Sequence, residues 1–456
     1  MVDTLGKKKY LVIGAVSIVL LLCLFWKAGI GEVSAAWVEQ TVDGQAEYSR
    51  YPLKHYGLDA VGEEKGVSRV GVWLLVMISN VVFSISNTFS YFVGWVVEQA
   101  YQVDFIGDAI DSIAGNIQTI AGVDAEGLRS DGLLPSLALL LIVFAGGYFV
   151  WTGIFKRKTA QAAANLAAFV LTFVLGMGVI AYSGTYLNTI NDFQKDFNEE
   201  IMDISSRITL GEEGGNMVHQ MRDNLFIIMV RNPYLMFQYG TSDIKAIGEE
   251  RVAELLSVER GSDERVEICM REYEEYGNDY MSSKDIVDQL GMCFVVLIVN
   301  VIVGVCMLIF SAMIIMSQIL FVLYMSFFPV ALIFSMFPGS GGRLRKLLDR
   351  CLDSILMRPG ISLILTIVFS ISMICYQIAG TGNYLWAMTL QGIVFIVALM
   401  KTRDLLGFMK IGKERGNVSP GVPIGRALMA SKAVERIFRG RRNRGSDRDN
   451  PGRRRA

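Results

Sequence analysis

Between Gln289 and Gly342 the chain runs for 54 consecutive residues without a charged side chain. A second uncharged run of 42 residues extends from Pro359 to Met400. One helical crossing of a bilayer needs only about 20 apolar residues, so both runs are too long for the buried helices of a water-soluble core. Composition agrees, because 52% of the 456 residues are hydrophobic and only 19% are charged, against about 25% in an average soluble protein. We therefore expect an all-α, polytopic integral membrane protein.

The N-terminus has the pattern of an export signal. Lys7 to Lys9 precede an apolar stretch from Tyr10 to Trp26, and a small-residue cleavage pattern follows at Val33-Ser34-Ala35. This pattern predicts a signal peptide over residues 1–35, with an uncleaved membrane anchor as the alternative. In both cases the segment that follows starts outside the membrane.

The positions of Lys and Arg predict the orientation of the spans, because short basic loops stay in the cytoplasm. An uncharged span from Leu133 to Phe155 is followed at once by Lys156-Arg157-Lys158, and a second span from Ala160 to Tyr182 returns to the outside. Residues 133–183 are therefore predicted to form a transmembrane hairpin with a cytoplasmic turn.

Within the predicted transmembrane region 289–400, the run from Gln289 to Gly342 must cross the membrane a net odd number of times, because the basic residues that follow it, from Arg343 to Arg350, should lie inside the cell. We expect one crossing near Met292 to Ile315, followed by a re-entrant or surface-lying helical segment. Prolines at Phe328-Pro329 and Phe337-Pro338 are expected to end that segment.

A final hairpin is formed by two uncharged stretches, Ile361 to Ala379 and Tyr384 to Met400. Its external turn is short, and it leads back to a cytoplasmic tail. Together with the earlier spans, this hairpin gives about five full crossings, with the mature N-terminus outside and the C-terminus in the cytoplasm.

The stretch from Val70 to Val97 lies in the predicted extracellular N-terminal segment, residues 36–132, and does not fit this count. It carries no charge, but its middle is unusually polar for a lipid-facing span. We interpret it as an embedded, non-crossing segment that is re-entrant or lies at the membrane surface. The alternative is a true crossing, which would put Lys156 to Lys158 outside. The polar residues in it are Asn80, Ser84, Ser86, Asn87 and Ser90.

Two further regions show the spacing of amphipathic helices. Residues 98–122 place isoleucines at steps of three and four. The predicted extracellular loop domain, residues 184–288, carries 22 acidic and 10 basic residues, a net charge of −12, and should be mostly helical. It begins with an amphipathic stalk with an apolar seam, which is predicted to continue the preceding transmembrane helix out of the bilayer. The seam residues are Tyr186, Ile190, Phe193, Phe197, Ile201, Ile204 and Ile208.

The tail, residues 401–456, has a net charge of +11. Its composition is typical of a disordered segment that is held at an anionic membrane leaflet, where each basic residue contributes about 1 kcal/mol. The alternative is that it binds DNA or an acidic cytoplasmic partner. The candidate lipid- or partner-binding residues are Arg436, Arg439, Arg441, Arg442, Arg444, Arg453, Arg454 and Arg455.

No pattern in the sequence indicates an enzyme, a metal site or a bound cofactor. The predicted spans contain no ionisable residue, which argues against an ion-coupled transporter. Their polar residues are more typical of hydrogen bonds between helices than of a pore lining. These candidate intramembrane contacts are Asn300, Ser317, Gln318, Gln377 and Gln391.

Several stretches between Tyr51 and about Met400, among them Asp104-Phe105-Ile106, resemble segments of one family of membrane proteins. The others are Tyr51-Pro52-Leu53-Lys54-His55-Tyr56-Gly57-Leu58-Asp59, Gly94-Trp95-Val96-Val97-Glu98-Gln99-Ala100-Tyr101, Arg222-Asp223-Asn224-Leu225-Phe226, Pro233-Tyr234-Leu235, Gln238-Tyr239-Gly240, and the two Phe-Pro pairs. Together they resemble the TrbL/VirB-type polytopic inner-membrane subunit of type IV secretion systems, as found in Gram-positive conjugative elements. The tail from Lys413 has no counterpart in this resemblance.

The resemblance implies a membrane channel or scaffold subunit that supports conjugative DNA transfer. It also implies an oligomer that works with other secretion subunits, including a secretion ATPase, within the lipid membrane and with DNA as a possible substrate. The main alternative is a stand-alone membrane transporter or permease, and a third is a surface-active or phage-defence membrane factor.

Overall fold

The computed structural model describes residues 46–61, 67–209, 217–282, 286–336, 342–379 and 383–407, all within one compact unit, Val42–Lys413. The signal peptide, the arginine-rich tail and Phe337-Pro338 lie outside the described residues. In chain order the elements are η1 (Leu53–His55), α3 (Val67–Gln102), α4 (Phe105–Ala121), β1 (Val123–Asp124), β2 (Gly127–Leu128), α5 (Leu133–Val150), η2 (Trp151–Phe155), α6 (Thr159–Ala181), α7 (Ser183–Thr209), α8 (Met217–Phe226), η3 (Ile227–Arg231), α9 (Asn232–Tyr239), α10 (Ile244–Ile247), α11 (Glu249–Ser257), α12 (Asp263–Glu274), η4 (Asp279–Met281), α13 (Ile286–Ser326), α14 (Phe328–Met336), α15 (Gly342–Ala379) and α16 (Tyr384–Gly407).

Six of the described helical stretches are long and apolar enough to cross a membrane, one more than the sequence predicts. The additional stretch begins at Val70 and includes α3 and α4. The all-α, polytopic membrane fold is thus confirmed. The six stretches are Val70–Ala121, Leu133–Phe155, Thr159–Ala181, Ile286–Ser326, Gly342–Ile378 and Tyr384–Gly407.

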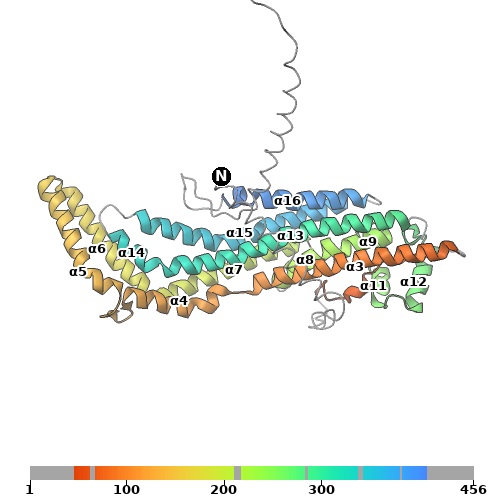
Figure 1. Ribbon diagram of the computed structural model, residues 1–456, viewed down its shortest axis with the longest axis horizontal. Coiled ribbons are helices and arrows are strands. Elements are labelled where there is room, and N and C mark those ends of the chain that lie inside the picture. The colour runs from red at the N-terminus through yellow and green to blue at the C-terminus, as the bar shows by residue number, and fades with distance from the viewer. Residues whose placement is uncertain are drawn as a thin grey trace, which may run out of the picture. The chain divides into compact units, whose positions relative to one another are not determined.

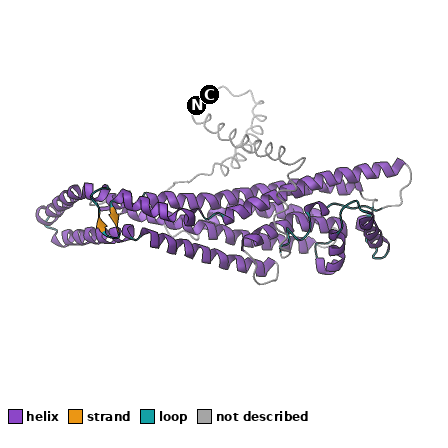
Figure 2. Ribbon diagram, turned by 90° about the horizontal axis from the view of Figure 1, so that it is seen from below, coloured by secondary structure: helices purple, strands orange, loops and turns teal. Residues whose placement is uncertain are grey.

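α3 packs along α13, and this pair has the most extensive contact between two helices among the described residues. Figures 1 and 2 show the bundle of long helices to which they belong. The two helices run in the same direction, because Asn300 of α13 contacts Ser86 of α3, and Gln318 farther along α13 contacts Val103 just after α3. α3 is one unbroken helix of 36 residues, about 54 Å long at 1.5 Å per residue. A re-entrant course for Val70 to Val97 is therefore excluded.

α13 is also longer than predicted. It continues without a break past Ile315 to Ser326, a total of 41 residues. Pro329 then lies in the first turn of α14, where a missing backbone N–H costs nothing because those N–H groups have no partner within the helix. A helix therefore ends just before Phe328-Pro329, as expected, but it is the continuation of α13 and not a separate embedded segment after Ile315.

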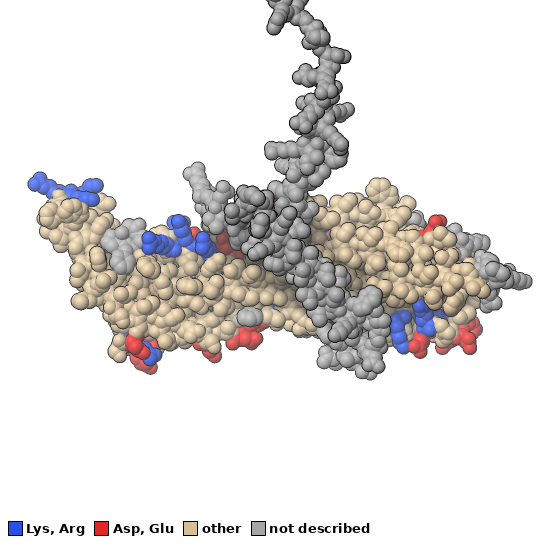
Figure 3. All heavy atoms as spheres, in the orientation of Figure 1, with Lys and Arg blue, Asp and Glu red and all other residues tan. Residues whose placement is uncertain are grey.

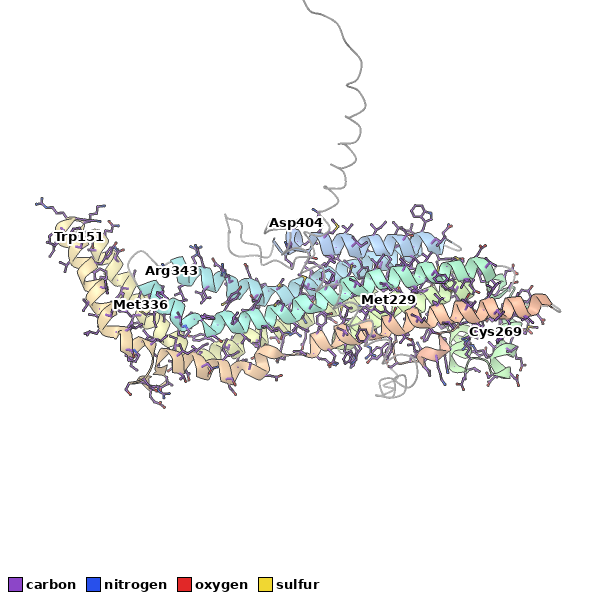
Figure 4. The ribbon with its side chains drawn as sticks, viewed as in Figure 1. Trp151, Met229, Cys269, Met336, Arg343 and Asp404 are labelled. Carbon is purple, nitrogen blue, oxygen red and sulfur yellow. The ribbon has the colours of Figure 1, made fainter. Side chains whose placement is uncertain are left out.

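α5 and α6 form a helical hairpin whose turn holds Lys156 to Lys158 (Figure 1). Trp151 lies near that turn, in a π-helical end of α5 (Figure 4). Only 17% of the most apolar window of α5 and 11% of that of α6 are buried, against 50% for α13. Large apolar side chains therefore cover most of the hairpin surface, as expected for helices surrounded by lipid.

The predicted extracellular loop, residues 184–288, is helical where the structure describes it, but it does not stand apart as a domain. Its middle, from Met221 to Tyr239, is buried among α3, α13, α15 and α16 (Figure 4 marks Met229). α10, α11 and α12, with Cys269, lie toward one end of the unit (Figure 4), and their buried side chains belong to the same hydrophobic core. The expectation of a loop domain outside the membrane helices is corrected accordingly.

Candidate functional site

The buried segment from Met221 to Tyr239 contains a π-helical turn, Ile227–Arg231, which we call the π-turn. Hydrogen bonds of a π-helix join residues five apart, so this turn interrupts the usual α-helical ladder between α8 and α9. In a water-free interior each displaced carbonyl needs another donor, because an unsatisfied backbone group costs several kcal/mol there.

Side chains from three long helices supply those donors. The Nδ2 of Asn300 in α13 donates to the Met229 carbonyl at 2.8 Å and to Ser86 Oγ at 2.9 Å. The hydroxyl of Tyr376 in α15 donates to the Ile228 carbonyl at 2.9 Å, and the Nε2 of Gln391 in α16 lies 3.4 Å from the same oxygen. The π-turn is therefore the point where α13, α15 and α16 are connected by hydrogen bonds.

A second irregularity lies in α15, which carries Pro359 in its interior. Proline has no N–H and leaves the carbonyl four residues earlier, that of Ile355, without its helical donor. Gln194 of α7 replaces the missing donor, because its Nε2 donates to the Ile355 carbonyl at 3.0 Å.

The third irregularity is the break between α3 and α4. Arg358 Nη2 donates to the Tyr101 carbonyl at 2.5 Å, and Gln318 Nε2 donates to the Val103 carbonyl at 3.1 Å. The Tyr101 hydroxyl is 3.0 Å from Ser362 Oγ, which in turn donates to Asn198 Oδ1 at 2.7 Å. These contacts join α3, α7, α13 and α15 through polar side chains.

Close to this break is a buried ion pair. Arg222 Nη1 lies 2.5 Å from Glu98 Oε2, and the two side chains are 9% and 6% exposed. His219 Nδ1 is 3.2 Å from Glu98 Oε1, and the Arg222 guanidinium lies 3.8 Å from the Tyr48 ring and 4.5 Å from the Tyr91 ring. We call these five residues the Glu98 cluster. It attaches α8 and the first described residues of the chain to α3.

Asp223 follows Arg222 and faces the same region. Its Oδ1 accepts the backbone N–H of Tyr48 at 3.0 Å. Burial raises the pKa of the Asp223 carboxyl to about 7, an effect that the neighbouring Glu47 increases and that Arg222 and the backbone donors only partly oppose. The charge of this side chain therefore changes near neutral pH.

The segment Tyr51–Asp59 connects the Glu98 cluster region to α11 and α12. Arg265, which is 1% exposed, donates to the carbonyls of His55, Leu255 and Val258 and pairs with Asp59 Oδ2 at 2.7 Å. The backbone N–H and carbonyl of Leu58 bond to Asn80 of α3, both at 2.8 Å. This segment therefore has a structural role at the junction of α3 with the α11–α12 cluster.

The candidate contacts named from the sequence separate into two groups. Asn300, Gln318 and Gln391 are buried and bond to other helices or to the backbone that follows them. Ser317 bonds only to the Ile314 carbonyl of its own helix, and Gln377 lies on the exposed surface of α15.

Sequence reasoning missed Glu98, Gln194, Arg222 and Arg358. Arg358 and Glu98 lie beyond the ends of the predicted spans but inside α15 and α3, so ionisable side chains do occur in helices that qualify as spans. Pro359 offered one usable signal, because a proline in a long apolar helix implies a carbonyl that needs a donor.

Among the described residues, no group of three or more His, Cys, Asp or Glu side chains could hold a metal ion. A hollow of about 360 Å³ lies elsewhere, between the β1–β2 turn and α6, and apolar residues line most of it. The chemistry at the junction is hydrogen bonding and ion pairing between helices.

No protein-family model matches the chain, and no solved structure matches it. Over 407 residues the chain is 20% identical to a Bacillus subtilis (strain 168) protein described as uncharacterized membrane protein YddG. That alignment covers 82% of this chain and 48% of the other protein, so the chain spans about half the length of the curated relative it matches.

Proposed function

We propose that this multi-pass membrane protein is a channel or scaffold subunit of a conjugative type IV secretion system. One observation carries the proposal: stretches that resemble the family, although far apart in sequence, meet at one place. Tyr56 packs edge-on against Phe226 and Tyr234, with ring centroids 5.2 and 5.4 Å apart, and Glu98 pairs with Arg222. The stretches that carry the resemblance are therefore in contact with one another in the folded chain.

In this role the chain assembles with copies of itself and with other secretion subunits, including a secretion ATPase that supplies energy. Its apolar hairpin contacts membrane lipids, and the arginine-rich tail is held at the inner leaflet. DNA is the substrate of the complete machine.

A mating experiment tests the role. Deletion of the gene should abolish transfer of the element that encodes it, while growth and small-solute uptake stay normal. Complementation with the intact gene is the control. Normal transfer in the deletion strain would contradict the proposal.

The orientation proposed with this function has the mature N-terminus outside and the C-terminus in the cytoplasm, which requires that an odd number of the six qualifying stretches cross the membrane. The distribution of charge supports it, since Lys and Arg at the α5–α6 turn and at the start of α15 lie along one edge, whereas the acidic residues near α4 lie along the opposite edge (Figure 3). Topology reporters fused after Lys158 and after Arg350 should report cytoplasm, and one fused after Glu259 should report the outside. A cytoplasmic signal after Glu259 would exclude this orientation.

A stand-alone transporter or permease is the second candidate, and the burial of Glu98 and Arg358 in long apolar helices favours it, because such residues often mark ion pathways. In this structure, however, Glu98 is paired with Arg222, and Arg358 bonds to the Tyr101 carbonyl. A selective uptake defect with normal mating transfer would place this candidate first.

A further inference from the structure

Helix α7 has its polar face turned inward. Asn191, Gln194 and Asn198 are 3%, 2% and 1% exposed, and they share one side of the helix with buried Leu187 and Ile201. The sequence predicted an amphipathic stalk with an apolar seam. In the structure, α7 uses amide side chains to hold α15, as the bond from Gln194 to the Ile355 carbonyl shows.

Three residues of the apolar seam are exposed on the surface. Tyr186, Phe193 and Ile204 are 50%, 56% and 45% exposed, and they follow one another at steps of seven and eleven residues, which places them on one face of an α-helix. The Phe193 ring stacks on Phe197, with centroids 5.9 Å apart. We call Tyr186, Phe193 and Ile204 the outer seam of α7.

Carboxylates line the outer seam. Asp196 is three residues from Phe193, and Glu200 is four residues from Ile204, so each neighbours the seam on the helix surface. Asp192 and Glu199 are exposed beside them, and within the described residues these four carboxylates make no ion pair. The nearby Lys195 is engaged with Asp104 at 2.6 Å.

This combination excludes lipid as the covering material. Carboxylates are costly in hydrocarbon, and α7 is not among the six stretches that qualify as membrane spans. An apolar stripe flanked by carboxylates that make no ion pair among the described residues suits a helical partner with an apolar stripe and positive flanks. A second copy related by a two-fold axis would place the same acidic side chains against each other, which is unfavourable.

We propose that the outer seam of α7 binds an amphipathic helix of a separate protein, in which Lys or Arg residues flank apolar residues spaced three or four apart. The inference depends on the surface of α7 alone and holds whether or not the chain belongs to a secretion system.

Site-specific photo-cross-linking tests this proposal in cells of the organism whose genome encodes the protein. A photoreactive amino acid replaces Phe193 in the full-length chain, and the matched control places it at Asn188, which is exposed on another side of the same helix. The Phe193 position should yield an adduct with a separate protein, and mass spectrometry should locate the link in a Lys- or Arg-flanked amphipathic helix. The Asn188 position should not yield it.

Charge reversal makes the test specific. The double substitution Asp196→Lys and Glu200→Lys should reduce the adduct by about tenfold or more, because like charges would then face each other. Glu264→Lys with Glu267→Lys, the same change on exposed positions of α12, should leave it unchanged. Both variants must reach the membrane at normal levels.

Four results would overturn the proposal. They are an adduct with a second copy of the chain, an adduct with residues 408–456 of the chain itself, an adduct with a segment that lacks basic flanks, and no protein adduct at Phe193.

Discussion

Helices α3 and α7 are built alike but face different surroundings. Both turn amides inward, Asn80 and Asn87 in α3 and Asn191 and Asn198 in α7, and both expose apolar side chains. In α3, however, no charge lies between Val70 and Val97, so its exposed face, which includes Trp73, is compatible with lipid. The exposed face of α7 mixes aromatic rings with carboxylates and suits a protein partner.

The comparison shows that, in a membrane protein, periodicity reveals which face of a helix is apolar but does not show which face is inside. Lipid is as apolar as a protein core, so polar side chains collect where helices meet and form hydrogen bonds there. If this view is right, substitutions at the inward amides and ion pairs should cost stability, whereas similar substitutions on exposed faces should not.

The largest loss is expected at the Glu98 cluster. Arg222→Leu leaves the buried Glu98 carboxylate without its partner, which typically costs about 3–5 kcal/mol. The loss should appear as a lower unfolding temperature of the purified chain in detergent. Lys54→Ala, which removes an ion pair to Glu259 in which both side chains are about two-thirds exposed, is the control and should change nothing measurable. Equal effects of the two substitutions would show that the Glu98 cluster does not hold α8 to α3.

The next effect depends on pH. The folded-state pKa of Asp223, about 7, exceeds the ordinary value of 3.8, so the folded chain holds this proton more tightly than the unfolded chain. The associated stability is fully present below about pH 4 and is lost as pH rises through 7, a change of about 4 kcal/mol at 1.36 kcal/mol per pH unit. Asp223→Asn should flatten this part of the stability profile, whereas Glu267→Gln should not. A wild-type profile that rises between pH 4 and 7 and is unchanged by Asp223→Asn would contradict a raised pKa for this carboxyl.

A smaller loss is expected at the π-turn. Asn300→Leu removes two hydrogen bonds and leaves the Met229 carbonyl without that donor, at a cost of about 1–3 kcal/mol. Gln377→Leu, the same change at an exposed position of α15, should be neutral or nearly so. Chemical denaturation of both variants in the same detergent compares them directly, and a neutral Asn300→Leu would show that the carbonyl finds another donor.

The smallest effect tests the pairing of Gln194 with Pro359. Gln194→Leu should cost about 1 kcal/mol, because the Ile355 carbonyl loses its donor. In a Pro359→Ala background the restored N–H can bond to that carbonyl, so the same substitution should cost only a few tenths of a kcal/mol. A double-mutant cycle measures the difference, and additive effects would mean that Gln194 does not compensate for the proline.

Hydropathy and charge sufficed to predict the all-α membrane fold, because the long uncharged runs leave few other structures possible. Hydropathy and charge did not predict that the segment from Met221 to Tyr239 is buried among the long helices. Its apolar stretch, Ile227 to Val230, is too short to stand out, and its polar residues are typical of a loop. Asn300 and Gln391 were recognised as contacts between helices, but their acceptors lie in a π-turn that no sequence pattern announced.

The outward seam of α7 could not be predicted for a related reason. Its spacing is that of any packed amphipathic helix, and only the structure shows that Gln194 and Asn198 face α15 instead. Pro359 was visible in the sequence, whereas the residue that satisfies its freed carbonyl comes from about 160 residues earlier in the chain.

Cysteine labelling tests the central claim, that the segment from Met221 to Tyr239 is buried among the long helices. Met229→Cys and Glu267→Cys are compared in the purified full-length chain with a membrane-impermeant maleimide. Met229 is 0% exposed and Glu267 is exposed, so Cys at 267 should react at once, and Cys at 229 should react only after denaturation in SDS. Equal labelling of the two positions in the folded chain would show that residues 217–239 form an external loop and would contradict the burial of this segment among α3, α13, α15 and α16.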